Sequence, residues 1–449
     1  MRKIKRYVFE GVLAAKFCEG ENMSVAIKVL TIIGTVLTIL KVYQILFFIG
    51  VFGAKKFKST ENKHKYAICI AARNEEKVIK NLLESISVQD YPKDKLTVFV
   101  VADNCTDNTA NIVREYQACT DIKIECLEHQ NPDERTKGFA LRFLFDQIRE
   151  NYGIESFDGY FIFDADNVLN KDYISRMNEA FDAGNKIITS FRNSKNFGQN
   201  WISYSYAIHW LRTCLLEHRG KTLLNLSCRV QGTGFLFSNE LVRNGWVYTS
   251  LTEDRAFCSD AVVQGYKVAY CEAAKFYDEQ PYELKVALRQ RLRWAKGHLQ
   301  SAAENCPKLA KNTFKFNGNS IRSYDCFWLN FPDAIFSIIR RILIWILQIT
   351  IGIIGAQTWG VAVGILLGLL TDIGIRFVSG WICAIFVNIY YHKYLPKVGA
   401  WKSIICVLLF PLFDEIGKWS MYIALFKRVE WKPIKHDYVV EVDDLISEQ

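Results

Sequence analysis

An apolar run over residues 24–53 constrains this chain more than any other feature of its sequence. Only Lys28 and Lys41 interrupt the run, and a helix needs about 20 apolar residues to cross a hydrocarbon core of about 30 Å. The run therefore predicts a transmembrane helix, which follows a basic N-terminal segment at 1–23. Three lysines within 55–58 come next, without a small-residue cleavage site before them, so we expect a retained anchor rather than a signal peptide.

The C-terminal part of the chain is apolar again in three stretches: 334–356, 358–391 and 403–426. The middle stretch contains Asp372 and Arg376, so it is compatible with one tilted span or with two short helices. Arg340 and Arg341 make the first stretch compatible with an interfacial helix as well as a spanning one. We therefore expect transmembrane or interfacial helices over 331–427, with their number left open.

Charge and cysteine usage narrow the class of protein. The net charge of +9 is compatible with nucleic-acid binding, but Lys and Arg gather at the edges of the apolar stretches, where anionic lipid headgroups would meet them. We therefore expect membrane lipids as partners and no nucleic acid. The 13 cysteines form no CxxC pair, which argues against a disulfide framework or a zinc site and for a reducing compartment. Residues 1–23 and 54–66 carry five basic residues each, so charge does not set the orientation, and 428–449 is predicted to be a short charged tail.

Residues 54–280 change to short β-rich runs that alternate with amphipathic stretches. The expected strands are YAICIAA (66–72), LTVFVVA (96–102), IKIECLE (122–128) and GYFIFDA (159–165). Between the first two, residues 75–89 carry apolar side chains at helical spacing: Val78, Ile79, Leu82, Leu83 and Ile86. The order strand, helix, strand predicts parallel pairing in a Rossmann-like sheet, whose ligands bind at the carboxyl ends of the strands.

Two carboxylates lie where the fourth expected strand gives way to a loop, in FIFDADN (161–167). Asp164 and Asp166 present hard oxygen ligands, which suit Mg²⁺ or Mn²⁺ bound together with phosphate oxygens. A strand end closed by aspartates in a turn is the alternative, since such triplets are common by chance.

The segment VVADNCTDNT (100–109) places Asp103 and Asp107 just after the second expected strand. An acid at that place can accept hydrogen bonds from a uracil or a ribose. A turn rich in Asp and Asn explains these residues as well.

The segment LTEDRAF (251–257) joins Glu253 to Asp254 at the start of an expected helix. One interpretation makes Thr252 the cap of that helix, with the acids in its first turn. The other makes Asp254 a general base near an acceptor hydroxyl.

The segment RQRLRWAKGHLQ (289–300) is a strongly basic helix within an amphipathic region at 281–330. Gln290, Arg293 and Trp294 lie three and four residues apart and so share one face. The guanidinium fork suits a departing diphosphate, and the indole suits a sugar ring. A basic helix lying against lipid is the alternative, although such a helix has no need of Gln290 on that face.

Two smaller features contain glycine. In RTKGFAL, Lys137 stands beside Gly138 at an expected helix start, which suits a phosphate or ribose contact or leaves a solvated lysine. In QGTGFLF, Gly232, Thr233 and Gly234 precede an apolar strand. An acceptor can approach the backbone closely there, although a tight turn explains the glycines almost as well.

The order of these motifs over residues 66–300 resembles the family 2 glycosyltransferases of the GT-A fold, in particular the membrane synthases of cellulose, hyaluronan and poly-N-acetylglucosamine. The resemblance implies an α/β GT-A domain, a Rossmann-like nucleotide-diphospho-sugar transferase fold, together with transmembrane α-helices. The implied donor-binding residues are Arg73, Glu75, Asp103, Lys137, Asp164 and Arg293. The implied catalytic residues are Asp254, as the base, and Glu253. The implied metal ligands are Asp164 and Asp166, and the implied acceptor-binding residues are Gln290, Trp294, Gly232, Thr233 and Gly234.

The sequence departs from the family pattern at two places. Arg73 stands where many relatives carry an aromatic residue, and Ala102-Asp103 keeps only one acid of the usual adjacent pair. The contact between Arg73 and the nucleoside base is therefore the least supported of the implied contacts.

The resemblance also implies a reaction and a place for it. We expect an inverting transferase that uses a UDP-sugar of the UDP-glucose or UDP-N-acetylglucosamine class and a divalent metal, Mg²⁺ or Mn²⁺. The expected product is an extracellular β-linked polysaccharide made processively, from a multi-pass protein of the plasma membrane with a cytoplasmic catalytic domain, because nucleotide donors are cytosolic. One alternative is single sugar transfer to a lipid acceptor. An alternative of another class is a non-catalytic membrane scaffold or transporter.

Overall fold

The computed structural model describes residues 2–355 and 357–440, with side chains from residue 21 onward. It divides into two compact units. The first unit comprises Met1–Ile45 and Pro332–Gly380, and the second comprises Leu46–Phe331 and Trp381–Gln449.

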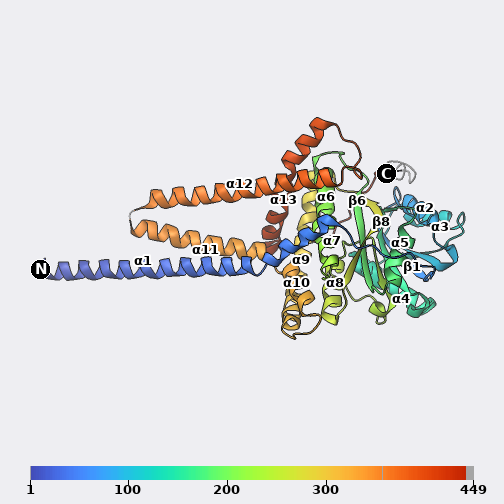
Figure 1. Ribbon diagram of the computed structural model, residues 1–449, viewed down its shortest axis with the longest axis horizontal. Helices are drawn as coiled ribbons and strands as arrows, with labels where there is room; N and C mark the ends of the chain where they lie inside the picture. The colour runs from blue at the N-terminus through green and yellow to red at the C-terminus, as the bar shows by residue number, and fades with distance from the viewer. Residues whose placement is uncertain (1, 356, 441–449) are drawn as a thin grey trace. The chain divides into compact units, whose positions relative to one another are not determined.

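The second unit is built on an eight-stranded mixed sheet in the order β3-β2-β1-β4-β7-β6-β8-β5 (Figure 1). The strands are β1 (Tyr66–Ala72), β2 (Leu96–Asp103), β3 (Lys123–His129), β4 (Gly159–Asp164), β5 (Val168–Leu169), β6 (Ile187–Ser194), β7 (Phe235–Ser238) and β8 (Val268–Asp278). β1, β2, β3 and β4 pair in parallel, as predicted, and their bounds agree with the sequence to within one residue. β7 runs antiparallel to both β4 and β6, so the sheet changes direction beside the DxD loop.

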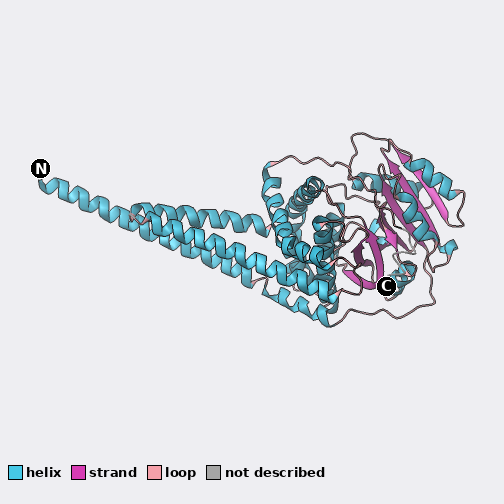
Figure 2. Cartoon of the chain, turned by 90° about the horizontal axis from the view of Figure 1, so that it is seen from above, coloured by secondary structure: helices cyan, strands magenta, loops and turns pink. Residues whose placement is uncertain are grey.

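Helices cover both faces of the sheet (Figure 2). α2 (Ile79–Ser87), α3 (Thr109–Gln117) and α5 (Tyr173–Asp182) bury apolar side chains in one core, and α4 (Lys137–Asn151) and α6 (Trp201–Arg212) do so in the other. β1 supplies both cores because its side chains alternate, with Ala67 and Cys69 on one face and Ile68 and Ile70 on the other. The predicted helix after β1 is confirmed.

The second unit also contains a π-helix at Thr213–His218, α7 (Arg219–Leu223), α8 (Glu253–Gln264), α9 (Leu284–Thr313) and α10 (Ser320–Asn330). The last apolar stretch forms α13 (Ala400–Phe426), which packs against α6 and α9. Arg291 on α9 donates to the Phe413 carbonyl at 2.8 Å, and Arg212 on α6 pairs with Asp414 at 2.8 Å. α13 thus contributes Phe410 and Phe413 to a protein core.

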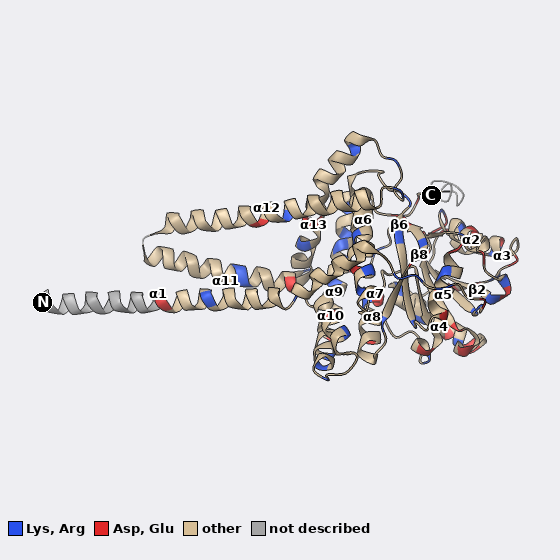
Figure 3. Ribbon diagram, viewed as in Figure 1, with Lys and Arg blue, Asp and Glu red and all other residues tan. Residues whose placement is uncertain are grey.

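The first unit consists of long apolar helices: α1 (Arg2–Ile39), α11 (Asp333–Ile354) and the first part of α12 (Thr358–Tyr390). By length and composition, the described residues contain three segments able to cross a membrane: Glu21–Phe52, Asp333–Ile354 and Thr358–Tyr390. Charged residues are sparse along α11, α12 and the part of α1 from Glu21 onward, and they are frequent around the sheet (Figure 3).

The structure bears on two of the expectations about the apolar stretches. The predicted transmembrane helix over 24–53 corresponds to Glu21–Phe52, which is long and apolar enough to cross a membrane, but the segment is not one continuous α-helix, because α1 ends at Ile39 and a 3₁₀ helix follows at Val42–Phe52. The stretch with two open interpretations is one 33-residue helix, α12. Its Asp372 forms an ion pair with Arg341 of α11, which explains how both charges are tolerated on apolar helices.

Candidate active site

A cavity of about 300 Å³ lies at the carboxyl ends of β1, β2 and β4, where a Rossmann-like sheet is expected to bind its ligand. Most of the predicted site residues line it: Arg73, Glu75, Asp103, Lys137, Asp164, Asp166, Gly232, Glu253, Asp254, Gln290, Arg293 and Trp294. Thr233 and Gly234 do not line it. Motifs spread over more than two hundred residues therefore meet at one place.

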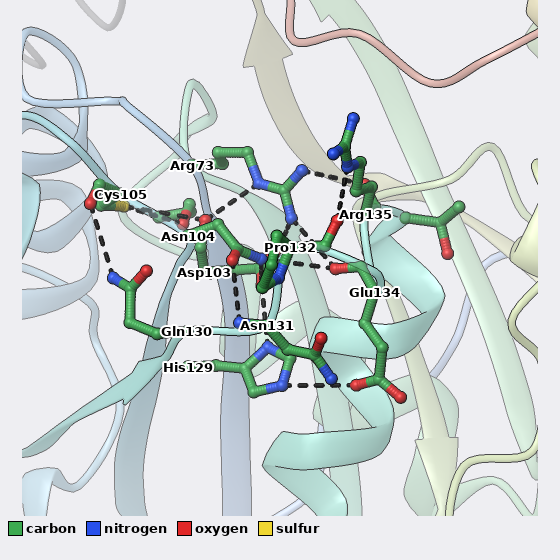
Figure 4. Close-up of polar contacts among 12 residues, drawn as sticks. Arg73, Asp103, Asn104, Cys105, His129, Gln130, Asn131, Pro132, Glu134 and Arg135 are labelled. Atoms are coloured by element: carbon green, nitrogen blue, oxygen red, sulfur yellow. Dashed lines mark hydrogen bonds and ion pairs between the residues drawn. The ribbon is translucent and has the colours of Figure 1, made fainter.

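Arg73 is tied to Asp103 at the end of β2 (Figure 4). Its Nε donates to the Asp103 carbonyl at 2.9 Å and its Nη2 to the Asp103 carboxylate. His129 Nδ1 lies 2.9 Å from the other carboxylate oxygen, and Asn104, whose φ of 49° is left-handed, donates to that same oxygen. The opposite side of Arg73 stacks on the Trp431 ring, with 4.6 Å from Cζ to the centroid. Arg73 thus holds Asp103 in place at the cavity wall.

Asp107 is part of a turn, which was the alternative interpretation of this segment. Its carboxylate accepts from the backbone N–H and hydroxyl of Thr109 at 3.1 and 2.6 Å, and from the Glu76 N–H at 3.1 Å. It does not line the cavity. Asp107 is a turn residue that starts α3.

Asp164 lies at the end of β4, where Lys137 contacts its carboxylate. Lys137, the first residue of α4, donates to the Asp164 carboxylate and to the Gly232 carbonyl, the latter at 2.8 Å. Burial disfavours its charge, yet Asp164, Glu253 and Asp254 hold the pKa of Lys137 above its ordinary value. A Cβ at Gly138 would lie 2.3 Å from the Tyr248 carbonyl, so only glycine lets α4 begin this close to that loop.

Asp166 is buried and accepts two hydrogen bonds, from the Glu279 N–H at 2.7 Å and from Asn167 Nδ2 at 3.1 Å. Burial opposes its ionisation, but His436, Lys195 and the Glu279 N–H hold its pKa below the ordinary value. The carboxylate is therefore charged at neutral pH.

The pair Asp164 and Asp166 supplies an incomplete ligand set for a metal. Within residues 2–355 and 357–440, no group of three or more His, Cys, Asp or Glu side chains could hold a metal ion. Two carboxylates do fit Mg²⁺ or Mn²⁺ when diphosphate and water oxygens complete the shell, as is usual for Mg²⁺. The Asp164 side chain is 40% exposed and faces the cavity, where such oxygens would come.

Glu253 and Asp254 begin α8 and line the same cavity. Thr252 is the N-cap residue of α8, as one interpretation expected, but its side chain makes no capping hydrogen bond. Glu253 is buried, and burial together with the Asp254 charge raises its pKa to about 7. Asp254 lies next to Gly232, since a Cβ on that glycine would be 3.7 Å from Asp254 Oδ2.

Thr233 and Gly234 support the DxD loop from behind instead of lining the cavity. The Asp164 N–H donates to Thr233 Oγ1 at 2.8 Å, and the Thr233 hydroxyl bonds to the Asn167 side chain. Gly234 has φ 63°, and a Cβ there would lie 2.2 Å from the Phe276 ring. Their predicted contact with an acceptor is not supported, because a spacing in sequence does not tell which side of a turn a residue faces.

Gln290, Arg293 and Trp294 share one face of α9, as predicted, and this face lines the cavity. Arg293 Nη1 donates to the Leu251 carbonyl at 3.1 Å, and Trp294 meets Trp210 edge-on at 5.8 Å. The Gln290 Oε1 is buried without a partner. α9 packs against α8, α10 and α13, which excludes a helix lying simply on lipid.

The tail was not predicted to take part, yet Trp431, Lys432, Pro433, Ile434 and His436 line the cavity. His436 Nδ1 lies 3.0 Å from both oxygens of Glu75. Burial disfavours its charge, but Glu75 and Asp166 raise the pKa of His436 to about 10. The segment therefore forms part of the wall of the site. Trp431, a lone tryptophan among charged residues, was the signal in the sequence that could have indicated this.

Known proteins resemble this chain over its middle part. Residues 64–297 match the model of the family described as "Glycosyltransferase like family 2". The chain is 27% identical over 253 residues to the probable glycosyltransferase YdaM of Bacillus subtilis, covering 52% of this chain and 55% of that protein. It is 26% identical over 237 residues to the poly-beta-1,6-N-acetyl-D-glucosamine synthase of Staphylococcus aureus, covering 51% and 53%. The chain thus spans about half the length of these curated relatives.

A solved structure shares the fold. The mannosyltransferase PcManGT from Pyrobaculum calidifontis, in complex with GDP-Man and Mn²⁺, superposes with a TM-score of 0.54 at 15% identity. The match covers 88% of this chain and 99% of that one. The predicted GT-A fold is therefore confirmed.

Proposed function

Since this chain belongs to glycosyltransferase family 2 and is a glycosyltransferase, we propose that it transfers a sugar from a UDP-sugar to an acceptor hydroxyl with inversion at the anomeric carbon. One observation carries this proposal. Asp254, Asp164, Lys137, Arg293 and Trp294 line a single cavity. This arrangement supports a base, a diphosphate site and an acceptor wall within reach of one substrate.

The proposed step is a direct displacement. The acceptor oxygen attacks the anomeric carbon and loses its proton to an Asp254 carboxylate oxygen, which acts as general base. The bond from that carbon to the β-phosphate oxygen breaks, and its electron pair leaves with UDP. Lys137 and Arg293 offset the negative charge that grows on the diphosphate. Burial and the neighbouring charge of Asp254 raise the pKa of Glu253 to about 7, so a large fraction of Glu253 is protonated at neutral pH.

A divalent metal fits this proposal at Asp164 and Asp166, where it would supply Lewis-acid stabilisation of the leaving diphosphate. Asp166 is charged and fixed by the Glu279 N–H, and Asp164 faces the cavity. Asp103, fixed by Arg73, would hold the nucleoside.

We propose a β-linked polysaccharide as the product, with a UDP-glucose or UDP-N-acetylglucosamine type donor and a cytoplasmic active site in a multi-pass protein of the plasma membrane. The apolar segments and the similarity to a polysaccharide synthase support this proposal. The Trp294 ring beside Trp210 offers aromatic faces of the kind on which sugar rings stack. Single transfer to a lipid is the competing product.

Purified full-length protein in detergent, supplied with a panel of UDP-sugars and Mg²⁺ or Mn²⁺, tests the proposal by UDP release and by the length and linkage of the product. We expect Asp254→Asn to lower the turnover number about a hundredfold or more while UDP binding is kept. Asp121→Asn, at an 88% exposed side chain, is the matched control. Equal turnover in Asp254→Asn and the wild type would remove the base role, and products with a single added sugar would favour the lipid acceptor.

A further inference from the structure

Two arginines at the α8 and α10 side of the cavity have no role in the reaction derived above. Arg229 precedes the GTG segment, and Arg255 follows the base Asp254 on α8; both line the cavity. Arg255 Nη1 donates to the Leu329 carbonyl at the end of α10, at 3.1 Å. The guanidinium groups thus belong to the acceptor side, away from the carboxylates at the ends of β2 and β4.

The two guanidinium groups differ in their partners. Among the described residues, Arg255 has no carboxylate within ion-pair distance. Arg229 Nη2 lies 3.2 Å from Glu217, whereas Lys221, which approaches Glu217 at 3.4 Å, has a closer carboxylate in Asp325 at 2.9 Å. Arg229 Nε is buried without a hydrogen-bond partner. A buried donor left unpaired is costly, so a partner that arrives with a ligand is expected.

Arg229 and Arg255 lie close enough to repel each other. Burial and Arg229 lower the pKa of Arg255, against the opposing effects of Asp254 and Glu217. Burial and Arg255 lower the pKa of His298 on α9 to about 3, so this imidazole adds no charge at neutral pH. An anion that contacts both guanidinium groups would offset their repulsion.

The position of Arg255 connects this charge to the acceptor. Asp254 and Arg255 both line the cavity from the first turn of α8, so an anion held by Arg255 would occupy the same cavity as the acceptor oxygen that Asp254 is proposed to deprotonate. The planar guanidinium fork matches two phosphate oxygens at once, whereas a neutral polysaccharide offers it only hydroxyls.

We propose that Arg229 and Arg255 form an anion subsite for the acceptor, and that the acceptor carries a phosphate group beside the hydroxyl that receives the sugar. This inference rests on the proposed function and specifies its acceptor. A phospholipid headgroup and a free polyol phosphate share this chemistry.

Inorganic phosphate binding to the full-length protein saturated with UDP tests the subsite, measured by ³¹P NMR titration. We expect Arg229→Gln and Arg255→Gln to weaken phosphate binding about tenfold each, while UDP affinity stays at the wild-type value. Arg255→Lys keeps the positive charge and should lose less phosphate affinity than Arg255→Gln. Arg243→Gln, at an exposed arginine, should keep the wild-type phosphate affinity. Wild-type phosphate affinity in both Gln variants would overturn the proposal. A parallel loss of UDP affinity would overturn it as well, by assigning the arginines to the donor.

Paired acceptors then identify the source of the phosphate. UDP release is measured with dioctanoyl-phosphatidylglycerol against dioctanoylglycerol, and with glycerol 1-phosphate against glycerol. We expect one phosphate-bearing probe to raise UDP release at about tenfold lower concentration than its neutral partner, and the Gln variants to remove that preference. A preference in the first pair indicates a lipid headgroup, and one in the second a free polyol phosphate. Equal stimulation of UDP release within both pairs would overturn the proposed anion subsite. Failure of UDP itself to bind would overturn the proposed function of a UDP-sugar transferase.

Discussion

The two walls of the cavity are made in different ways. The donor wall comes from the ends of parallel strands β1, β2 and β4, each followed by a short connection and a helix. The second wall is the rest of the lining: the first turn of α8, one face of α9, and the tail around Trp431, which contacts Arg73 of the donor wall. The first wall is fixed by local chain order, and the second only by packing between distant segments. Four substitutions test how far this contrast extends.

The largest effect is expected at the donor wall. Asp166→Asn removes a buried charge that the Glu279 N–H stabilises, and we expect turnover to fall about a hundredfold or more with weaker dependence on added metal. Asp172→Asn, at a partly exposed helix start, is the control. UDP release titrated with Mn²⁺ measures both quantities. Unchanged metal dependence would contradict the assignment.

The turn between the two walls should come next. Gly234→Val combines a φ of 63° with a Cβ position 2.2 Å from the Phe276 ring, so we expect a loss of about 3 kcal/mol in unfolding free energy. Gly184→Ala has φ 87° and open space around it, so only the backbone strain of about 1 kcal/mol should remain. Thermal unfolding in detergent measures the difference. Equal losses of unfolding free energy in the two variants would show that the Phe276 ring moves to accommodate the new side chain.

Glu253, in the second wall, should make the unfolding free energy of the protein depend on pH. Because its pKa in the fold, about 7, lies above the ordinary 4.5, the folded state binds more protons and loses stability as pH rises between these values. We expect a loss of about 2 kcal/mol between about pH 5.5 and pH 7.5, absent in Glu253→Gln. Glu304→Gln, at an exposed position on α9, should keep the wild-type profile. Parallel profiles in the wild type and Glu253→Gln would show that this carboxyl is not protonated by burial.

The smallest effect is expected at the tail. Trp431→Ala removes the ring stacked on Arg73, so we expect the donor KM to rise about fivefold with little change in kcat. Trp401→Ala, at an 80% exposed ring, is the control. Steady-state UDP release over a range of donor concentrations measures the split. A change confined to kcat would place Trp431 with the acceptor.

The contrast between the walls also explains what could be predicted from the sequence. The apolar runs of β1 to β4 stand out, and the acids that follow them lie at the sheet edge by topology alone. β6 was missed because its buried positions are polar, with Arg192 paired to Asp278 and Ser190 donating to the Gly234 carbonyl at 2.6 Å. Such strands lack the apolar pattern from which a strand is recognised.

The part of the second wall that the sequence did not reveal depends on long-range pairs. His436 and Glu75 are 361 positions apart, and nothing local to either one indicates the other. Thr233 was assigned to the wrong side of its turn for a similar reason, because its partner Asn167 comes from a distant strand end. The face of α9, by contrast, follows from helical spacing alone.

The tail has a practical consequence for how the protein is handled. Val440 accepts a hydrogen bond from Asn81 on α2 at 3.2 Å, a few residues after the tail has passed Glu75 and Glu279. A reporter inserted directly after Val440 would therefore disturb the donor wall. Preparations with and without that insertion should differ in their apparent affinity for the donor.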